Sequence, residues 1–414
     1  INLHCKCYNV MTIADLIIKF YEWMGIDHVF TVSGGGSIFL CDSLKNSRKI
    51  NYICCHHEQG AIFAAEGYAR AAGKVGGVLV TTGPGGTNII TGLNSAFIEG
   101  TPLFVVSGQV FSNQRLTRHN VRQYGLQESN IVELSKSVTK QSTSLEKSDD
   151  VVDVLKELYE IMISGRPGPV LLDIPADLQK TVYKGKTNFY FFKETNPLKE
   201  NTNKFEERLG ELNKIIKKSE KPILLVGNGI NNSKYGIEIL KHFEALGIPL
   251  LNSWNASSID KYSNYLGTPG MFSQRYPNCI INKSDLILVL GCRLHIGLTG
   301  YNIGQFFDQS RVIWVDIDES ELKKYNSKNI LKINSNIDDL YKVLERLEFK
   351  KSFRWLEKCQ LFKSKVKSLN ISERNRSSRY IDMFDFLDVL YSRLDADDII
   401  ITDMGLSFVG THQY

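Results

Sequence analysis

Three strand-like segments that each run directly into a turn and a helix constrain the fold of this chain more than any other feature. The segments are His28–Val32, Tyr52–Cys55 and Val78–Thr82. Each is apolar or β-branched, and a glycine-rich turn or an alanine-rich helix follows it. A strand followed at once by a helix is half of a parallel α/β unit. We therefore predict an α/β fold of doubly wound parallel sheets, with a cleft where neighbouring strands end.

Glu58 stands at one of these strand ends, just before the alanine-rich helix Ala61–Ala72. Two interpretations remain open for it. Acidic residues are favoured in the first turn of a helix, so Glu58 can be a helix cap. A carboxylate at a strand end can equally face a ligand in the cleft. The neighbouring glycine turns carry neither GxGxxG nor the Gly-Lys-Ser/Thr of a phosphate loop, so neither nucleotide motif is indicated.

Longer motifs then point to a family. In chain order they read VFTVSGGG, HHEQGAIFAAEGYARAAGKVG, VTTGPGGTNIITGLNSAFIEGTPLFVVSGQV, LQES and GRPGPVLLDIPADL. This series resembles the acetolactate-synthase-like family of thiamine-diphosphate enzymes. The resemblance covers Thr12 to Leu178 and continues more weakly to Asp318. It implies an aminopyrimidine-binding domain, a middle domain, and a third domain that holds the diphosphate with its magnesium.

The resemblance also implies roles for individual residues. Glu58 matches the carboxylate that activates the cofactor through nitrogen N1′ of the aminopyrimidine. Gln127 matches a glutamine that faces the reacting carbons. The implied cofactor contacts are Gly34, Gly35, Thr81, Pro84, Asn88 and Gly405, with Glu58 among them. The Gly-Asp-Gly motif that accompanies the magnesium ligands does not occur in the sequence, so no metal ligand is predicted in this chain and magnesium is expected from a missing C-terminal domain.

The implied activity is that of a thiamine-diphosphate-dependent carboligase or decarboxylase, a transferase or lyase acting on a 2-keto acid such as pyruvate with a second carbonyl compound as acceptor. Departures from the family pattern at Val32-Ser33, Leu126 and Leu406-Ser407 keep alternatives open. One is a thiamine-diphosphate enzyme of surface-polysaccharide or nucleotide-sugar biosynthesis. Another is a non-catalytic relative that lacks the diphosphate domain. A nicotinamide or flavin oxidoreductase would need a dinucleotide fingerprint. Arg293 and Thr299-Gly300 resemble the flavin-proximal region of acetolactate synthases, which leaves FAD binding open.

The chain is predicted to divide into several segments. These are an extension (1–10), the aminopyrimidine-binding domain (11–183), a linker (184–203), a middle α/β domain (204–350), a second linker (351–379) and the start of a truncated diphosphate-binding domain (380–414). The last segment is expected to hold a helix over Tyr380–Leu394 and a strand over Ile399–Thr402. A strand followed by Gly405 would begin the next α/β unit.

Length, charge and cysteine content limit the number of domains, the kinds of partner and the cellular location that can be expected. The 414 residues predict two to three domains, and the formal net charge of +5 is too small to predict a nucleic-acid partner. No apolar run has the length of a membrane span, so no membrane partner is expected. The eight cysteines lack zinc spacing. Because Cys54 and Cys55 fall on a strand of buried type, reduced, buried thiols and a cytoplasmic location are predicted.

A homodimer or tetramer is expected from the resemblance, with each active site shared between two chains. The helix Ala61–Ala72 is predicted to lie in the interface, because Ala64, Ala65 and Ala69 would permit close approach of a partner. The alternative is that these alanines pack on their own sheet.

Overall fold

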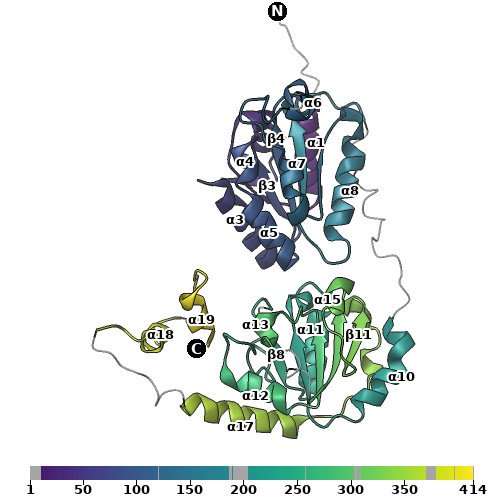
Figure 1. The fold of residues 1–414 in the computed structure, drawn as a ribbon, viewed down its shortest axis with the longest axis vertical. Helices are drawn as coiled ribbons and strands as arrows, with labels where there is room; N and C mark the ends of the chain where they lie inside the picture. Colours follow the sequence, from purple (N-terminus) through teal and green to yellow (C-terminus); the bar gives the residue numbers. More distant parts are fainter. Residues whose placement is uncertain are drawn as a thin grey trace, which may run out of the picture. The chain divides into compact units, whose positions relative to one another are not determined.

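The computed structural model describes residues 11–119, 121–185, 189, 204–256, 258–302, 306, 309–369, 379–395 and 397–413. The chain forms two compact units, within residues 1–199 and 200–414, and each is described by itself (Figure 1). The predicted linker at 184–203 lies almost entirely outside the described residues. None of the helices in the described ranges has the length and apolar character needed to span a bilayer.

The first unit is built on a parallel six-stranded sheet with the order β2-β1-β3-β4-β6-β5. Its strands are β1 (His28–Thr31), β2 (Asn51–Cys54), β3 (Gly76–Val80), β4 (Leu103–Gln109), β5 (Gln141–Ser144) and β6 (Val170–Pro175). The chain moves from β1 outward to β2 and then returns to place β3 on the other side of β1. This reversal between β1 and β3 is a topological switch point, where ligands bind in open α/β sheets.

Helices cover both faces of this sheet (Figure 1). One hydrophobic cluster joins the sheet to α1 (Ile13–Trp23), α2 (Ile38–Asn46) and α8 (Val151–Ile163). A second cluster joins it to α3 (Glu58–Ala72), α5 (Ile90–Glu99) and α7 (Ile131–Ser135). Three short helices, α4 (Pro84–Thr87), α6 (Leu116–His119) and α9 (Ala176–Gln179), complete the unit. The predicted doubly wound α/β fold is thereby confirmed.

Local sequence explains where the helices near the cleft begin and end. Thr12 and Asp15 form a reciprocal capping box at the start of α1, which satisfies two backbone N–H groups. His57, rather than Glu58, caps α3, because its ring nitrogen accepts from the N–H of Gln59 at 3.1 Å. The same helix ends at Gly73, which has the left-handed conformation that favours glycine.

The second unit contains a parallel five-stranded sheet with the order β11-β10-β9-β7-β8. Its strands are β7 (Pro222–Val226), β8 (Leu250–Asn252), β9 (Leu286–Leu290), β10 (Arg311–Asp316) and β11 (Ile330–Asn334). The helices are α10 (Lys204–Ile216), α11 (Gly236–Ala245), α12 (Arg275–Lys283), α13 (Ile296–Thr299), α15 (Glu319–Lys323), α16 (Ile337–Tyr341), α17 (Phe353–Leu369), α18 (Met383–Tyr391) and α19 (Leu406–Gln413). Two hydrophobic clusters pack on its two faces, as in a doubly wound sheet.

Strand β2 corrects the prediction of buried cysteines. It is the edge strand of its sheet and all four of its residues are exposed, Cys54 included, while Cys55 is half-buried. An apolar, β-branched run indicates a strand but does not say whether helices cover both of its faces. His56 and His57 lie beyond the end of the strand.

The alanines of α3 correct the predicted interface. Ala61, Ala65 and Ala69 are buried in the cluster between α3 and the sheet, and Ala64 is half-buried against it. These four alanines therefore pack on their own sheet, as the alternative had it. On α5, Gly92 faces Ile62 so closely that an added Cβ would lie 2.1 Å from that side chain. Small residues on α3 and α5 thus bring elements of one chain together.

Two segments of the second unit also differ from expectation. The predicted linker 351–379 begins with α17, whose Leu356 and Cys359 are buried in the core of the unit. The predicted strand Ile399–Thr402 belongs to neither described sheet, and Ile399 and Ile401 are almost fully exposed. A strand needs a neighbour to pair its backbone groups, so an apolar β-branched run alone does not form one.

Candidate active site

The turns that follow β1 and β3 meet at the switch point of the first sheet. Thr81 follows β3, and its hydroxyl accepts a hydrogen bond from the N–H of Gly36 at 3.1 Å. A Cβ added at Gly34 would lie 2.5 Å from the Thr81 side chain. Gly34 is therefore required by the close approach of the two turns. At Gly35 an added Cβ would meet nothing within 4 Å, so this glycine borders open space.

Glu58 follows the adjacent strand β2 and is held by Asn88. The Asn88 side-chain amide donates to Glu58 Oε2 at 2.9 Å, across a separation of 30 residues in sequence. Gly85 lies between these groups and Thr81, since its added Cβ would be 2.8 Å from Thr81 Cγ2 and 3.5 Å from Glu58 Oε1. Glu58, Thr81 and Asn88, predicted separately, are thus brought together around a glycine turn that has no room for a side chain.

Gln127 approaches the same turn through its backbone. Its φ is +55°, unusual for a residue other than glycine, and Gly83 has a φ of +62°. A Cβ added at Gly83 would lie 1.7 Å from the Gln127 carbonyl oxygen, so the two backbones are in close contact. The Gln127 side chain is exposed. The turn after β3 is therefore in direct backbone contact with the loop that contains Gln127.

Pro84 and Gly405 are the remaining residues predicted to contact the cofactor. Pro84 is exposed at the first position of α4. Gly405 belongs to the second unit, where it is exposed and has a φ of +119° just before α19. That helix packs within its own unit, with the Phe408 ring 5.3 Å from that of Trp254. The arrangement within the first unit supports an aminopyrimidine-type site there.

A buried polar cluster beneath the loop was missed by sequence reasoning. Gln109 ends β4 and Asp173 lies near the end of β6, and the Gln109 amide donates to Asp173 Oδ2 at 3.2 Å. Burial raises the pKa of the Asp173 carboxyl to about 7, while the Arg115 guanidinium 3.9 Å away acts in the opposite direction. Polar residues inside the apolar runs FVVSGQV and VLLDIP were the available signal.

The second unit has its own turns and a surface groove. Gly227 and Gly291, after β7 and β9, pack so closely that a Cβ on Gly227 would lie 2.1 Å from the Gly291 carbonyl oxygen. Asp318 caps α15 through the N–H of Ser320. Arg293 lies 3.7 Å from Glu321. None of these contacts identifies a flavin site.

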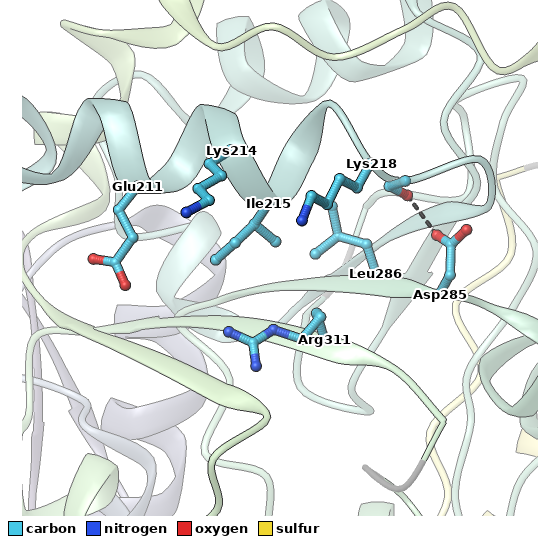
Figure 2. Close-up of a pocket in the computed structure, with 8 residues that line it drawn as sticks. Glu211, Lys214, Ile215, Lys218, Asp285, Leu286 and Arg311 are labelled. Carbon is cyan, nitrogen blue, oxygen red and sulfur yellow. Dashed lines mark hydrogen bonds between the residues drawn. The ribbon is translucent and has the colours of Figure 1, made fainter.

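The groove, of about 500 Å³, lies along α10 near the start of β9 and β10. Figure 2 shows Lys214 of α10 and Lys218, just beyond its end, extending above Arg311. Asp285 at the end of the groove accepts hydrogen bonds from backbone N–H groups and from the Ser219 hydroxyl. The groove contains none of the predicted site residues. In the described part of the chain, no group of three histidines, cysteines or carboxylates is arranged to hold a metal ion.

Comparison with known proteins agrees with this geometry. The family profile described as "Thiamine pyrophosphate enzyme, N-terminal TPP binding domain" matches residues 11–134, and the one described as "Thiamine pyrophosphate enzyme, central domain" matches residues 209–347. The chain belongs to the thiamine pyrophosphate enzyme family. The first match contains the whole cleft, from Gly34 to Gln127, and the second contains the sheet of the second unit.

Several acetolactate synthases are similar to the chain. The large subunit from Haemophilus influenzae is 31% identical over 331 residues, covering 77% of this chain and 56% of that protein. The chloroplastic enzyme of Arabidopsis thaliana is 32% identical over 330 residues, 77% of this chain and 46% of that protein. The large subunit from Buchnera aphidicola subsp. Acyrthosiphon pisum is 28% identical over 404 residues, 96% and 69% respectively. The chain spans about half the length of the first two relatives.

The cleft of the first unit fits the aminopyrimidine end of the family's cofactor. Glu58 Oε2 is occupied by Asn88, whereas Oε1 has no hydrogen-bond partner among the described residues and is left to face a ligand. The glycines at positions 34 and 85 leave no space for a Cβ, so the turns form a close-fitting backbone cradle. A carboxylate oxygen beside a shaped backbone surface suits a flat heterocycle with a ring nitrogen that can hydrogen-bond.

Proposed function

We propose that this chain is part of a thiamine-diphosphate-dependent carboligase that acts on a 2-keto acid such as pyruvate. The observation that carries the proposal is the Glu58–Asn88 pair beside the Gly85 turn, at the switch point of a sheet whose family binds this cofactor. Thiamine diphosphate, when bound, supplies an acidic thiazolium carbon and an electron sink for loss of carbon dioxide. The similarity to acetolactate synthases favours this activity over the polysaccharide alternative.

The residues of the chain then have distinct tasks. Glu58 holds a proton at the aminopyrimidine ring nitrogen through Oε1, while the Asn88 amide fixes the carboxylate through Oε2. The Thr81 hydroxyl ties the turn after β1 to the turn after β3 and so fixes the cradle walls. Gln127, at the rim, orients the carbonyl substrates. Because such groups are pre-positioned by the fold, little reorganisation is needed during reaction.

We include in this proposal that magnesium accompanies the diphosphate and that the protein is cytoplasmic. The test is direct. The complete protein, supplied with pyruvate, thiamine diphosphate and magnesium, is expected to release carbon dioxide and to form a ligated 2-hydroxy-keto acid. Release of carbon dioxide with only free aldehyde as product would identify a simple decarboxylase, and no reaction with any 2-keto acid would overturn the proposal.

We further propose that the first unit pairs with a second copy of the chain through β2 and the outer sides of α3 and α5. The exposed side chains that support this surface are Tyr52, Ile53, Phe63, Phe97 and Ile98. An uncovered edge strand with apolar side chains is unfavourable in water unless a partner covers it. The buried alanines of α3 serve the core of one chain, so larger exposed side chains would make the contacts between chains.

A further inference from the structure

Gln109 is almost completely buried and every hydrogen-bonding position of its side chain is used. It is 2% exposed. Its Oε1 accepts from the Thr82 hydroxyl at 2.5 Å and from the N–H of Val110 at 2.9 Å. Its Nε2 donates to the Ser129 carbonyl at 3.3 Å and to Asp173 Oδ2 at 3.2 Å. A primary amide has two acceptor lone pairs and two donors, so the side chain has one satisfied orientation.

The partners of Gln109 belong to segments that meet at the candidate active site. Thr82 directly precedes Gly83, in the turn that forms part of the cofactor cradle. Ser129 closes the loop that carries Gln127, and its hydroxyl also donates to the Gly83 carbonyl at 3.5 Å. One buried amide therefore connects the turn after β3 to the end of the loop.

The position of Gln127 depends on this connection. Its carbonyl rests against Gly83, and its own φ of +55° is one that residues with a side chain rarely adopt. Such a conformation persists only where the surroundings fix it. The Gln127 side chain is exposed and makes no hydrogen bond within the described residues, so its direction is set by the backbone that carries it.

The loop itself is closed by Glu128, which is 5% exposed. Its carboxylate accepts from the N–H of Leu116 at 2.6 Å and from the N–H of Gly125 at 3.1 Å. These two bonds tie the start of the loop to its end. The end of the loop is therefore held to its start through Glu128, and it meets the Gly83 turn through Ser129 and the Gln127 carbonyl.

We propose that Gln109 is a positioning residue, which couples the Gly83 turn to the Gln127 loop and so sets the place of Gln127 at the reacting carbons. The part concerning reaction rests on the function proposed above. Loosening the connection is expected to lower the fraction of decarboxylated substrate that becomes ligated product, because misplacement by about 1 Å can cost on the order of 100-fold in rate.

The first experiment uses Gln109→Glu, which keeps the acceptor and the size of the side chain but has at most one donor, so it cannot donate to Ser129 and Asp173 at the same time. In the holoenzyme we expect kcat for ligation to fall about 10- to 100-fold, with a smaller change in KM. In a Gln127→Ala background the same substitution should cost less than about 2-fold, because Gln109 acts through Gln127. Equal fold losses in both backgrounds would overturn the proposed coupling. Gln114→Glu, on the exposed part of the loop, is the matched control.

A second variant separates positioning from a general contribution to folding. In the double variant Gln109→Glu/Asp173→Asn, the amide introduced at position 173 can donate to the carboxylate introduced at position 109. This restores a bond between the two side chains but not the bond to Ser129. We expect the melting temperature to recover and the ligation rate to stay low. Recovery of both would mean that Gln109 only stabilises the unit, and this would refute the positioning role.

A third measurement does not depend on the reaction. Arg118 and Arg122 are exposed in the loop and are trypsin sites. We expect Gln109→Glu to speed cleavage at these sites by about 10-fold or more, since local opening governs proteolysis of a folded chain. Unchanged cleavage would overturn the coupling itself. Faster cleavage in a protein that ligates no 2-keto acid would keep the coupling and overturn only the proposed function.

Discussion

Replacing Asp173 with asparagine should change how the stability of the first unit depends on pH. Asp173 is 1% exposed, and its Oδ1 has no hydrogen-bond partner among the described residues. Burial raises its pKa from 3.8 to about 7, against the opposing effect of Arg115. The folded state therefore holds a proton that the unfolded state releases above its own pKa of 3.8.

The difference between the folded and unfolded pKa values sets the sign and the size of the pH dependence of the free energy of unfolding. The stabilisation from the bound proton is fully present below pH 3.8 and is lost as the pH rises towards about 7. Each pH unit in that window is worth about 1.4 kcal/mol, so wild type should lose about 3 kcal/mol between pH 5 and pH 8 through this group alone. Asparagine does not titrate. The free energy of unfolding of Asp173→Asn relative to wild type should therefore rise by about 3 kcal/mol over the same interval.

Hydrogen exchange of the β4 and β6 amides at pH 5 and pH 8 measures this quantity for the first unit alone. Asp149→Asn, an exposed carboxylate ahead of α8, is the matched control and should keep the wild-type slope. If wild type and Asp173→Asn show the same change in protection between the two pH values, Asp173 does not bind the proton and the account of the buried cluster is wrong.

Three further outcomes are expected. Gly83→Ala should destabilise the first unit by about 1–3 kcal/mol in thermal unfolding, because the new Cβ would meet the Gln127 carbonyl at a positive φ, whereas Gly60→Ala, with nothing within 4 Å, should not. Asn88→Ala should weaken cofactor binding about 10-fold by calorimetry with an unchanged melting temperature, because an unheld Glu58 must be ordered by the ligand. Ile53→Asp should shift sedimentation towards monomer, and Ile237→Asp, at an exposed isoleucine of the other unit, should not.

Secondary structure was predictable from sequence where the pattern within one segment is enough to identify the element. Strand β3 was predicted from the segment Val78–Thr82, because a buried parallel strand reads as a continuous apolar run. Strand β5, Gln141–Ser144, is polar and half-buried, and it was missed because its only support is pairing with β6. The opposite error occurs at Ile399–Thr402, where an apolar run predicted a strand but has no strand beside it in either described sheet.

The candidate site was predictable only in part, for a related reason. Glu58 and Thr81 stand next to recognisable strand ends, so topology alone brings them to one edge of the sheet. The Asn88–Glu58 and Gln109–Asp173 bonds join residues 30 and 64 positions apart. Nothing local in either segment specifies such a partner. At Glu58 the structure gives the N-cap of α3 to His57 and places Glu58 in the first turn, so its position agrees with both interpretations, and its bond to Asn88 is what favours a ligand.

The most direct test of the proposed site is the rate at which bound thiamine diphosphate exchanges its C2 proton for deuterium in Glu58→Gln. Glutamine has nearly the same shape but cannot act as an acid or base. The holoenzyme with Glu58→Gln should bind the cofactor and show exchange about 100- to 10,000-fold slower than wild type. Glu133→Gln, an exposed carboxylate of the same unit, should exchange at the wild-type rate. Exchange near the wild-type rate in Glu58→Gln would contradict the role assigned to this carboxylate.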